Sequence, residues 1–357
     1  MPMPIQYVAP RWLPGGNLQT IWPALYGRRV DGPAPVYRRE RWATPDGDFI
    51  DVDFSVDPVG RTAGGPRGRR PLLVLFHGLE GSSRSHYAEA FAGFAATSGW
   101  DFAVPHFRGC SGQINLAPRA YHSGDFEEIG WVLSRFASMQ ALQQAPRGSG
   151  ESPVELPGIV AVGVSLGGNA LLRWAEETGE SAARTVRAVA SVSAPLDLAA
   201  GGAAIGRGFN RLVYTRMFLG SMKPKALAKL AQHPGLFDRD TLVNARTLHE
   251  FDNVFTAPLH GFRDTDDYWA RGSAKPHLCD IRVPALVVNA ANDPFVPAAS
   301  LPRDSEVGAH VTLWQPAHGG HAGFPLGRPP GHVRAMPERV GRWLAQHLPP
   351  GPESGHG

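Results

Sequence analysis

The sequence has few of the residues that mark several large classes of protein. Only two of its 357 residues are cysteine, Cys110 and Cys279, which is too few for a disulfide framework. They form no CxxC pair, so neither a cysteine-based zinc site nor another metal site is expected. No block of like charges occurs and the formal net charge is only +3, which argues against a nucleic-acid partner.

Long apolar runs are missing as well. No stretch approaches the roughly 20 residues that cross a membrane, so no stable membrane insertion is expected. Residues 1–7 have neither the basic nor the apolar region of a signal peptide, and we expect a cytoplasmic protein. The composition, 43% hydrophobic and 19% charged, suits a globular chain that is large for one domain and small for two.

Apolar, β-branched runs alternate with amphipathic segments through most of the chain. Strands are predicted at 71–76, 100–107, 158–164, 186–195, 284–289 and 310–314, and helices at 85–98, 126–139, 169–177 and 337–348. Residues 39–44 and 49–56 flank an Asp-Gly turn and predict a β-hairpin. This alternation indicates an α/β fold with a mostly parallel sheet that helices cover on both faces.

The alternation stops between residues 196 and 275, where a helical, loop-rich stretch mixes apolar and basic side chains. We interpret it as a helical cap over the carboxyl ends of the strands, where α/β proteins bind ligands. The core then comprises residues 39–195 and 276–348, with loops at 57–70 and 142–158. Residues 1–38 form an arm on this core. Its prolines and glycines argue against a long helix, and it either packs on the core or lines the substrate entrance. The tail, 349–357, is expected to be disordered.

The most informative stretch is the predicted strand 158–164 followed directly by a helix. Between them lies Gly163-Val164-Ser165-Leu166-Gly167. A sharp turn from strand to helix needs small residues on either side, and it exposes the serine oxygen at a helix N-terminus. The alternative is an ordinary turn in which Ser165 caps the helix. We interpret Ser165 as a nucleophile.

A serine hydroxyl becomes nucleophilic only when a base removes its proton. Serine hydrolases built on parallel sheets carry an acid and then a histidine after the serine. Asp293 follows the predicted strand 284–289, and His318 and His321 follow the strand 310–314. Asp293 would fix the tautomer of the imidazole. The residues alone leave the two histidines tied as the base, and a metal pair at this HxxH is weakly supported.

An oxyanion hole needs two convergent backbone amides. Leu166 follows the nucleophile and supplies one, and Leu79, in the turn after the strand 71–76, is the predicted second. His77 is expected to order that turn. Cys110 has no base beside it in the sequence and is interpreted as structural.

Several motifs together resemble the YheT-type esterases of the α/β-hydrolase superfamily. They are PRWLPGGNLQT (10–20), HGLEGSS (77–83), HFRGCSG (106–112), YHSGD (121–125), GVSLGGN (163–169) and HGGHAGF (318–324). The resemblance covers roughly residues 8–345. It implies Ser165 as nucleophile, Asp293 as acid and His321 as base, and hydrolysis of carboxylic esters without a cofactor.

The predicted function is therefore a serine esterase for small, water-soluble esters of short to medium chain length. Related animal proteins include membrane-anchored phospholipases, so a lipase or phospholipase is an alternative. A second alternative is a binding protein without catalysis on the same fold. Amide or thioester hydrolysis, the natural substrate and the oligomeric state stay open at this stage.

Overall fold

The computed structural model describes residues 7–56, 70–143 and 157–349. The predicted loops 57–70 and 142–158 and the tail 349–357 fall almost wholly outside these residues. Eight strands form one sheet in the order β1-β2-β4-β3-β5-β6-β7-β8. They are β1 (Val36–Ala43), β2 (Phe49–Val56), β3 (Leu72–Phe76), β4 (Asp101–Pro105), β5 (Ile159–Val164), β6 (Ala188–Val192), β7 (Ala285–Val288) and β8 (Val311–Trp314).

The sheet is parallel except at one edge. β1 and β2 form the predicted hairpin, with Ala43 opposite Phe49 beside the Asp-Gly turn. β2 also runs antiparallel to β4, and every pair from β4 to β8 is parallel. Strands β3, β5, β6 and β7 are buried along their whole length, because helices cover both faces. The predicted α/β fold with a mostly parallel sheet is confirmed.

Helices pack on both faces of the sheet. One face is covered by α3 (Phe126–Gln143) and α4 (Leu166–Thr178), whose apolar side chains share a core with Leu72, Val74 and Phe76 of β3. The other is covered by α2 (His86–Thr97) and α12 (Ala335–Ala345), which pack against the alternate residues Leu73 and Leu75. Successive residues of one strand thus enter two different cores.

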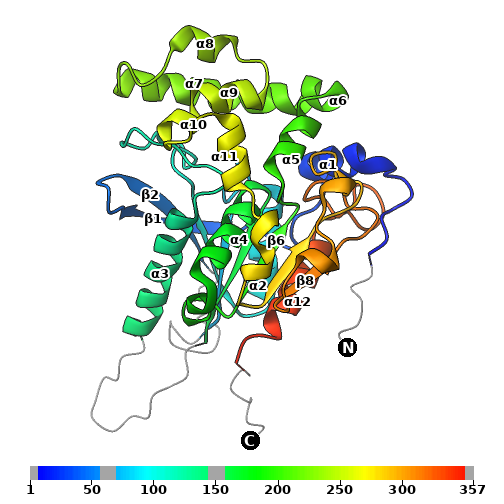
Figure 1. The fold of residues 1–357 in the computed structure, drawn as a ribbon. Coiled ribbons are helices and arrows are strands. Elements are labelled where there is room, and N and C mark those ends of the chain that lie inside the picture. The colour runs from blue at the N-terminus through cyan, green and yellow to red at the C-terminus, as the bar shows by residue number, and fades with distance from the viewer. Residues whose placement is uncertain (1–6, 57–69, 144–156, 350–357) are drawn as a thin grey trace, which may run out of the picture.

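The segment between β6 and β7 is helical, as predicted for the cap. Figure 1 shows these helices gathered beyond one end of the sheet. They are α5 (Leu198–Ile205), α6 (Gly208–Asn210), α7 (Arg216–Gln232), α8 (Arg239–Asn244), α9 (Leu248–Val254), α10 (Thr256–Leu259) and α11 (Thr265–Gly272). A separate apolar cluster that includes Leu219, Leu242 and Phe251 holds several of them together. We call this group the cap; the exact domain boundaries stay a prediction.

The prediction that the N-terminal arm has no long helix is wrong. Residues Gly15–Tyr26 form α1, a helix of 12 residues with Pro23 inside it. Proline cannot donate to the carbonyl four residues earlier, here that of Gln19. This oxygen faces the loop at Gly323, where an added Cβ would lie 1.9 Å from it. Tertiary packing against that loop therefore holds a helix that local propensity disfavours.

None of the helices in the described ranges combines the length and the hydrophobicity that a membrane span requires.

Candidate active site

Ser165 lies at the turn where β5 passes into α4. Its backbone has φ 54° and ψ −121°, a conformation that is rare for a residue with a side chain. Such strain persists only where the surrounding structure imposes it, and it concentrates at functional sites. Here the turn is held by the first residues of α4, since Gly168 N–H and Asn169 N–H both donate to the Ser165 carbonyl.

The glycines on either side of Ser165 are required by close contacts. A Cβ at Gly163 would lie 2.3 Å from the carbonyl oxygen of Gly167. A Cβ at Gly167 would lie 2.5 Å from the carbonyl oxygens of both Phe76 and His77. These carbonyl groups belong to the backbone and cannot move aside, so both positions require glycine. This is the steric requirement on which the motif's prediction of a sharp turn rested.

Asp293 and His321 are in direct contact. The Nδ1 atom of His321 lies 2.9 Å from Oδ2 of Asp293 and 3.2 Å from Oδ1. A carboxylate only accepts, so Nδ1–H of His321 is the donor in this contact, and in the neutral imidazole Nε2 is the acceptor. The Asp293 side chain is fully buried, and its Oδ1 also accepts the amide of Phe295 at 2.8 Å. His318 is exposed, and its Nδ1 lies 3.4 Å from Nδ2 of Asn292.

The end of β6 brings the serine turn and the histidine loop together. Ser165 N–H donates to the carbonyl of Val192 at 2.8 Å. The next residue, Ser193, accepts the amide of Ala322 on its hydroxyl oxygen at 2.9 Å. Ala322 directly follows His321, whose ring centroid lies 4.2 Å from that of Phe295. Two consecutive residues thus tether both loops at the same edge of the sheet.

Both predicted oxyanion-hole residues, Leu79 and Leu166, line one cavity together with Ser165. Leu166 is the first residue of α4, where amides have no acceptor within the helix. The amides on either side of Leu79 are engaged: Gly78 N–H donates to the Tyr87 hydroxyl and Glu80 N–H to the Tyr121 hydroxyl. Neither the Leu79 nor the Leu166 amide donates to another group of the described chain.

His77 orders the turn that carries Leu79, as predicted. Its ring is fully buried, and burial lowers its pKa to about 3, so the imidazole is neutral. Nδ1 donates to the carbonyl of Gly78 at 2.8 Å, and Nε2 accepts the amide of Phe107 at 3.1 Å. One ring therefore fixes the loops after β3 and β4.

The cavity lies between the cap and the serine turn. Its empty volume, which includes space open to solvent, is about 1110 Å³. The cap supplies a wall of aliphatic and aromatic side chains, including Leu198, Ile205, Phe218, Met222, Phe251 and Phe255. Ligand sites of this kind bury the apolar part of a small molecule and orient it through a few polar groups.

Charged groups in the cavity wall are paired with other groups of the protein. Lys225 of α7 forms an ion pair with Glu80, with Nζ 2.8 Å from Oε2. Arg119 is held by both carboxylate oxygens of Asp125 at 2.8 and 2.9 Å. In these two pairs the charge is balanced within the protein, whereas Lys229 and Asp252, which also line the cavity, bond to neutral groups.

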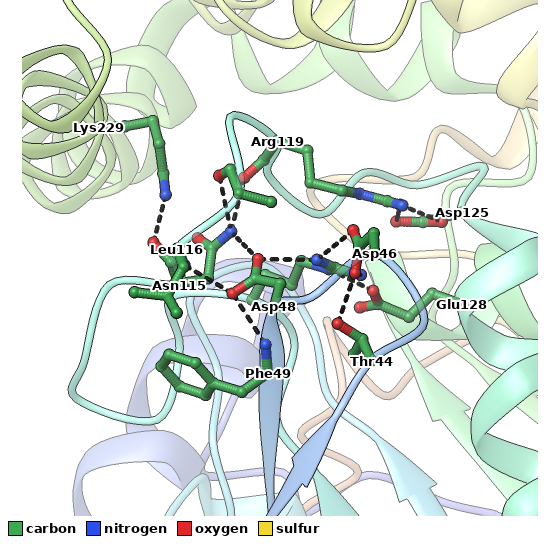
Figure 2. Close-up of polar contacts among 12 residues, drawn as sticks. Thr44, Asp46, Asp48, Phe49, Asn115, Leu116, Arg119, Asp125, Glu128 and Lys229 are labelled. Atoms are coloured by element: carbon green, nitrogen blue, oxygen red, sulfur yellow. Dashed lines mark hydrogen bonds and ion pairs between the residues drawn. The ribbon is translucent and has the colours of Figure 1, made fainter.

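Arg108 also lines the cavity and is the centre of a buried network. Its guanidinium contacts Asp46 and Asp48 at 2.8 Å and Glu128 at 2.5 Å. Figure 2 shows these acids together with Lys229, which reaches from the cap to the carbonyl of Asn115. The network connects the β1–β2 turn, α3 and the cap.

Cys110 behaves as a structural residue rather than a nucleophile. Burial raises the pKa of its thiol to about 12, so it stays protonated. Its nearest cation, Lys225, lies 3.8 Å from Sγ. Among the described residues, no group of three or more histidine, cysteine, aspartate or glutamate side chains could hold a metal ion.

Sequence reasoning missed the polar residues that hold the loops of Asp293 and His321. Gln19 and Thr20 of α1 are buried and bond to both loops, and Asn292 links one loop to the other. The signal available was the NLQT sequence, because polar residues in the middle of a short, otherwise apolar segment need partners when buried.

A family model described as the alpha/beta hydrolase fold matches residues 71–327, more than half of the chain. The chain belongs to this family. Its structure is similar to that of the Pyrobaculum calidifontis esterase, with a TM-score of 0.53 at 17% identity over 88% of this chain and 86% of that one. At such low identity the likeness shows the fold.

Within this fold the chain belongs to the YheT-like family. It is 35% identical to YheT of Escherichia coli (strain K12) over 345 residues, which cover 96% of this chain and 94% of YheT. That relative is itself named an esterase only provisionally. The human protein named Phospholipase ABHD3 is 27% identical over 297 residues, covering 82% of this chain and 68% of that protein. The resemblance inferred from the motifs is confirmed.

Proposed function

We propose that the protein is a serine hydrolase that cleaves carboxylic esters of short to medium chain length. The observation that carries the proposal is the contact between Asp293 and His321. The end of β6 holds the loop of His321 beside the turn of Ser165, whose backbone is strained. Ser165 lines a largely apolar cavity. The provisional esterase name of the YheT relative agrees with this chemistry.

In the first half of the reaction, Ser165 Oγ attacks the ester carbonyl carbon while Nε2 of His321 takes the hydroxyl proton. Asp293 holds the imidazole in the required tautomer and stabilises the imidazolium. The carbonyl oxygen becomes an oxyanion, which the free amides of Leu79 and Leu166 stabilise. The intermediate collapses, His321 gives its proton to the departing alcohol, and the acyl group stays on Ser165.

In the second half, water takes the place of the alcohol. His321 removes a proton from the water, and the resulting hydroxide adds to the acyl carbon. The same two amides stabilise the second oxyanion. Collapse breaks the bond to Ser165, whose Oγ recovers the proton from His321, and the carboxylic acid leaves.

The cavity wall supports uncharged acyl chains of limited length. Each buried methylene favours binding by about 0.8 kcal/mol until the cavity is full. Further carbons must stay in water or displace the cap. We therefore expect kcat/KM to rise from acetate esters, pass through a maximum at medium length and fall for the longest chains.

The test combines covalent labelling with hydrolysis of p-nitrophenyl esters from acetate to palmitate. A fluorophosphonate should label the wild-type protein on Ser165 and leave Ser165→Ala unlabelled, and the variant should lose kcat by a factor on the order of 10⁶. Ser138→Ala, which changes an exposed serine on α3, is the matched control.

Two outcomes would replace the proposal. Efficiency that rises through palmitate and increases further on phospholipid vesicles would favour a lipase, in line with the phospholipase name of the human relative. A folded wild-type protein that neither reacts with fluorophosphonates nor hydrolyses any ester or thioester would favour a binding protein on the same fold.

A further inference from the structure

Two of the three buried residues of α1 are polar. Its buried residues are Gln19, Thr20 and Pro23. Its leucines at 18 and 25 are 46% and 63% exposed. A helix that packs for hydrophobic stability turns its leucines inward. Besides its apolar contacts through Pro23 and Ile21, the helix therefore makes buried polar contacts that need a separate explanation.

The side chain of Gln19 bonds to the loops of both Asp293 and His321. Its Oε1 accepts the amide of Gly319 and the Nδ2 group of Asn292, each at 2.9 Å. Its Nε2 donates to the carbonyl of Leu13 at 2.8 Å, which fixes the orientation of the amide. Asn292 directly precedes Asp293, and Gly319 lies two residues before His321. One buried amide thus spans the gap between the loops after β7 and β8.

The side chain of Thr20 holds the backbone of His321 itself. Its Oγ1 accepts the amide of His321 at 2.8 Å and donates to the carbonyl of Gly16 at 2.8 Å. The second bond holds the hydroxyl in one rotamer, so its lone pair stays directed at His321. Asn292 completes the link between the loops, because its Oδ1 accepts the amide of Gly320 at 3.0 Å.

The backbone of α1 lies directly against both loops. An added Cβ at Gly16 would lie 1.8 Å from the carbonyl oxygen of Asn292. An added Cβ at Gly320 would lie 2.7 Å from the carbonyl carbon of Gln19. The helix is thus fitted against both loops at backbone distance, and its position fixes theirs.

We infer that Gln19 and Thr20 are positioning residues for the catalytic pair, so that α1 is part of the active-site machinery although none of its residues lines the cavity. The inference rests on the proposed function. Asp293 and His321 lie in the loops that follow β7 and β8. Their 2.9 Å hydrogen bond forms only while these two loops stay in a fixed position relative to each other. Misplacement of a catalytic group by about 1 Å can lower the rate about 100-fold.

The test uses the full chain with Gln19→Met and Thr20→Val, which keep the size of each side chain and remove its hydrogen bonds. We expect kcat for a p-nitrophenyl ester to fall by about 100-fold, with KM within about threefold, because the cavity is unchanged. Thr20→Ser retains the oxygen and should restore kcat to within about threefold of wild type.

Two matched variants remove buried side-chain hydrogen bonds at residues that neither line the cavity nor bond to the loops of Asp293 and His321. Thr265→Val changes a fully buried threonine of α11 whose hydroxyl donates to the carbonyl of His249 at 2.8 Å. Gln140→Met changes a buried glutamine of α3 that reaches the carbonyl of Gly158. Both should lower Tm to a similar degree as the α1 variants while kcat stays near wild type.

A second measurement does not depend on activity. The proton on Nδ1 of His321, held by Asp293, should give a low-field ¹H NMR resonance that is present in wild type and Thr20→Ser and lost or broadened in Gln19→Met and Thr20→Val. Should wild type hydrolyse no ester, the proposed function fails and this resonance alone decides the inference. Unchanged kcat, or an unchanged resonance in both α1 variants, would overturn it.

Discussion

Replacing Arg108 with alanine is expected to lower the free energy of unfolding by about 3–5 kcal/mol. Arg108 is 5% exposed, and three carboxylates surround its guanidinium. Breaking a buried ion pair from one side leaves the remaining charge without compensation, which destabilises more than the pair itself stabilised.

The loss falls unequally on the three acids. Asp48 keeps the amides of Phe49 and Leu116 at 2.8 and 2.6 Å, so its charge stays solvated by the protein. Asp46 is partly exposed and regains water. Glu128 is buried, and burial together with the charge of Asp125 already raises its pKa to about 7. Most of the destabilisation is therefore expected at Glu128.

The pH dependence of the variant gives an independent check. Without Arg108 the pKa of Glu128 rises further, because the cation that lowered it is gone. When a carboxyl group has a higher pKa in the folded protein than in the unfolded chain, folding becomes less favourable as the pH rises above the pKa in the unfolded chain, about 4.5 for Glu128. The destabilisation is complete once the pH exceeds the pKa in the folded protein. Arg108→Ala should thus lose less stability at pH 6 than at pH 8, and adding Glu128→Gln should recover part of the loss.

The assay is urea denaturation at 25 °C followed by tryptophan fluorescence and circular dichroism. Arg303→Ala is the control, because Arg303 forms an exposed ion pair with Glu306 that water already screens. An Arg108→Ala midpoint that moves no further than that of Arg303→Ala would refute the reasoning about the buried network.

Three further predictions concern the serine turn, the base and acid stability. Gly167→Ala should lower the stability of the folded protein by about 3 kcal/mol, because the added Cβ would lie 2.5 Å from two carbonyl oxygens at the end of β3. The control is Gly220→Ala on α7, whose Cβ meets nothing within 4 Å, and thermal unfolding compares the two variants. His321→Ala should abolish ester hydrolysis and His318→Ala should retain it; the reverse result in the kcat assay would reassign the base. Burial lowers the pKa of His122 from 6.5 to about 3. Its stabilising contribution is therefore present above pH 6.5 and is lost as the pH falls toward 3. The Tm of His122→Phe should consequently fall less than that of wild type between pH 7 and pH 4.

Local sequence pattern was sufficient for the parallel sheet, the hairpin and the serine turn. β3 and β5 are identified by apolar runs of strand length. Both faces of these strands are buried, so consecutive residues, and not only alternate ones, are apolar. Gly163 and Gly167 predict the turn because the steric requirement lies within five residues of chain. The sequence also singled out Ser165, Asp293 and His321, whose catalytic roles stay a prediction.

The tertiary structure decided what depends on distant pairing. The residues alone left His318 and His321 tied, and only the folded chain places His321 in contact with Asp293, 28 residues away; its role as the base stays a prediction. The arm was expected to lack a long helix because its prolines and glycines disfavour one locally. Gln19 and Thr20 bond to partners about 300 residues further along, and such contacts leave no periodic trace in the sequence. Helix propensity reflects only residues close together in the sequence. The contacts that stabilise α1 and align the loops of Asp293 and His321 involve backbone groups that come together only in the folded chain.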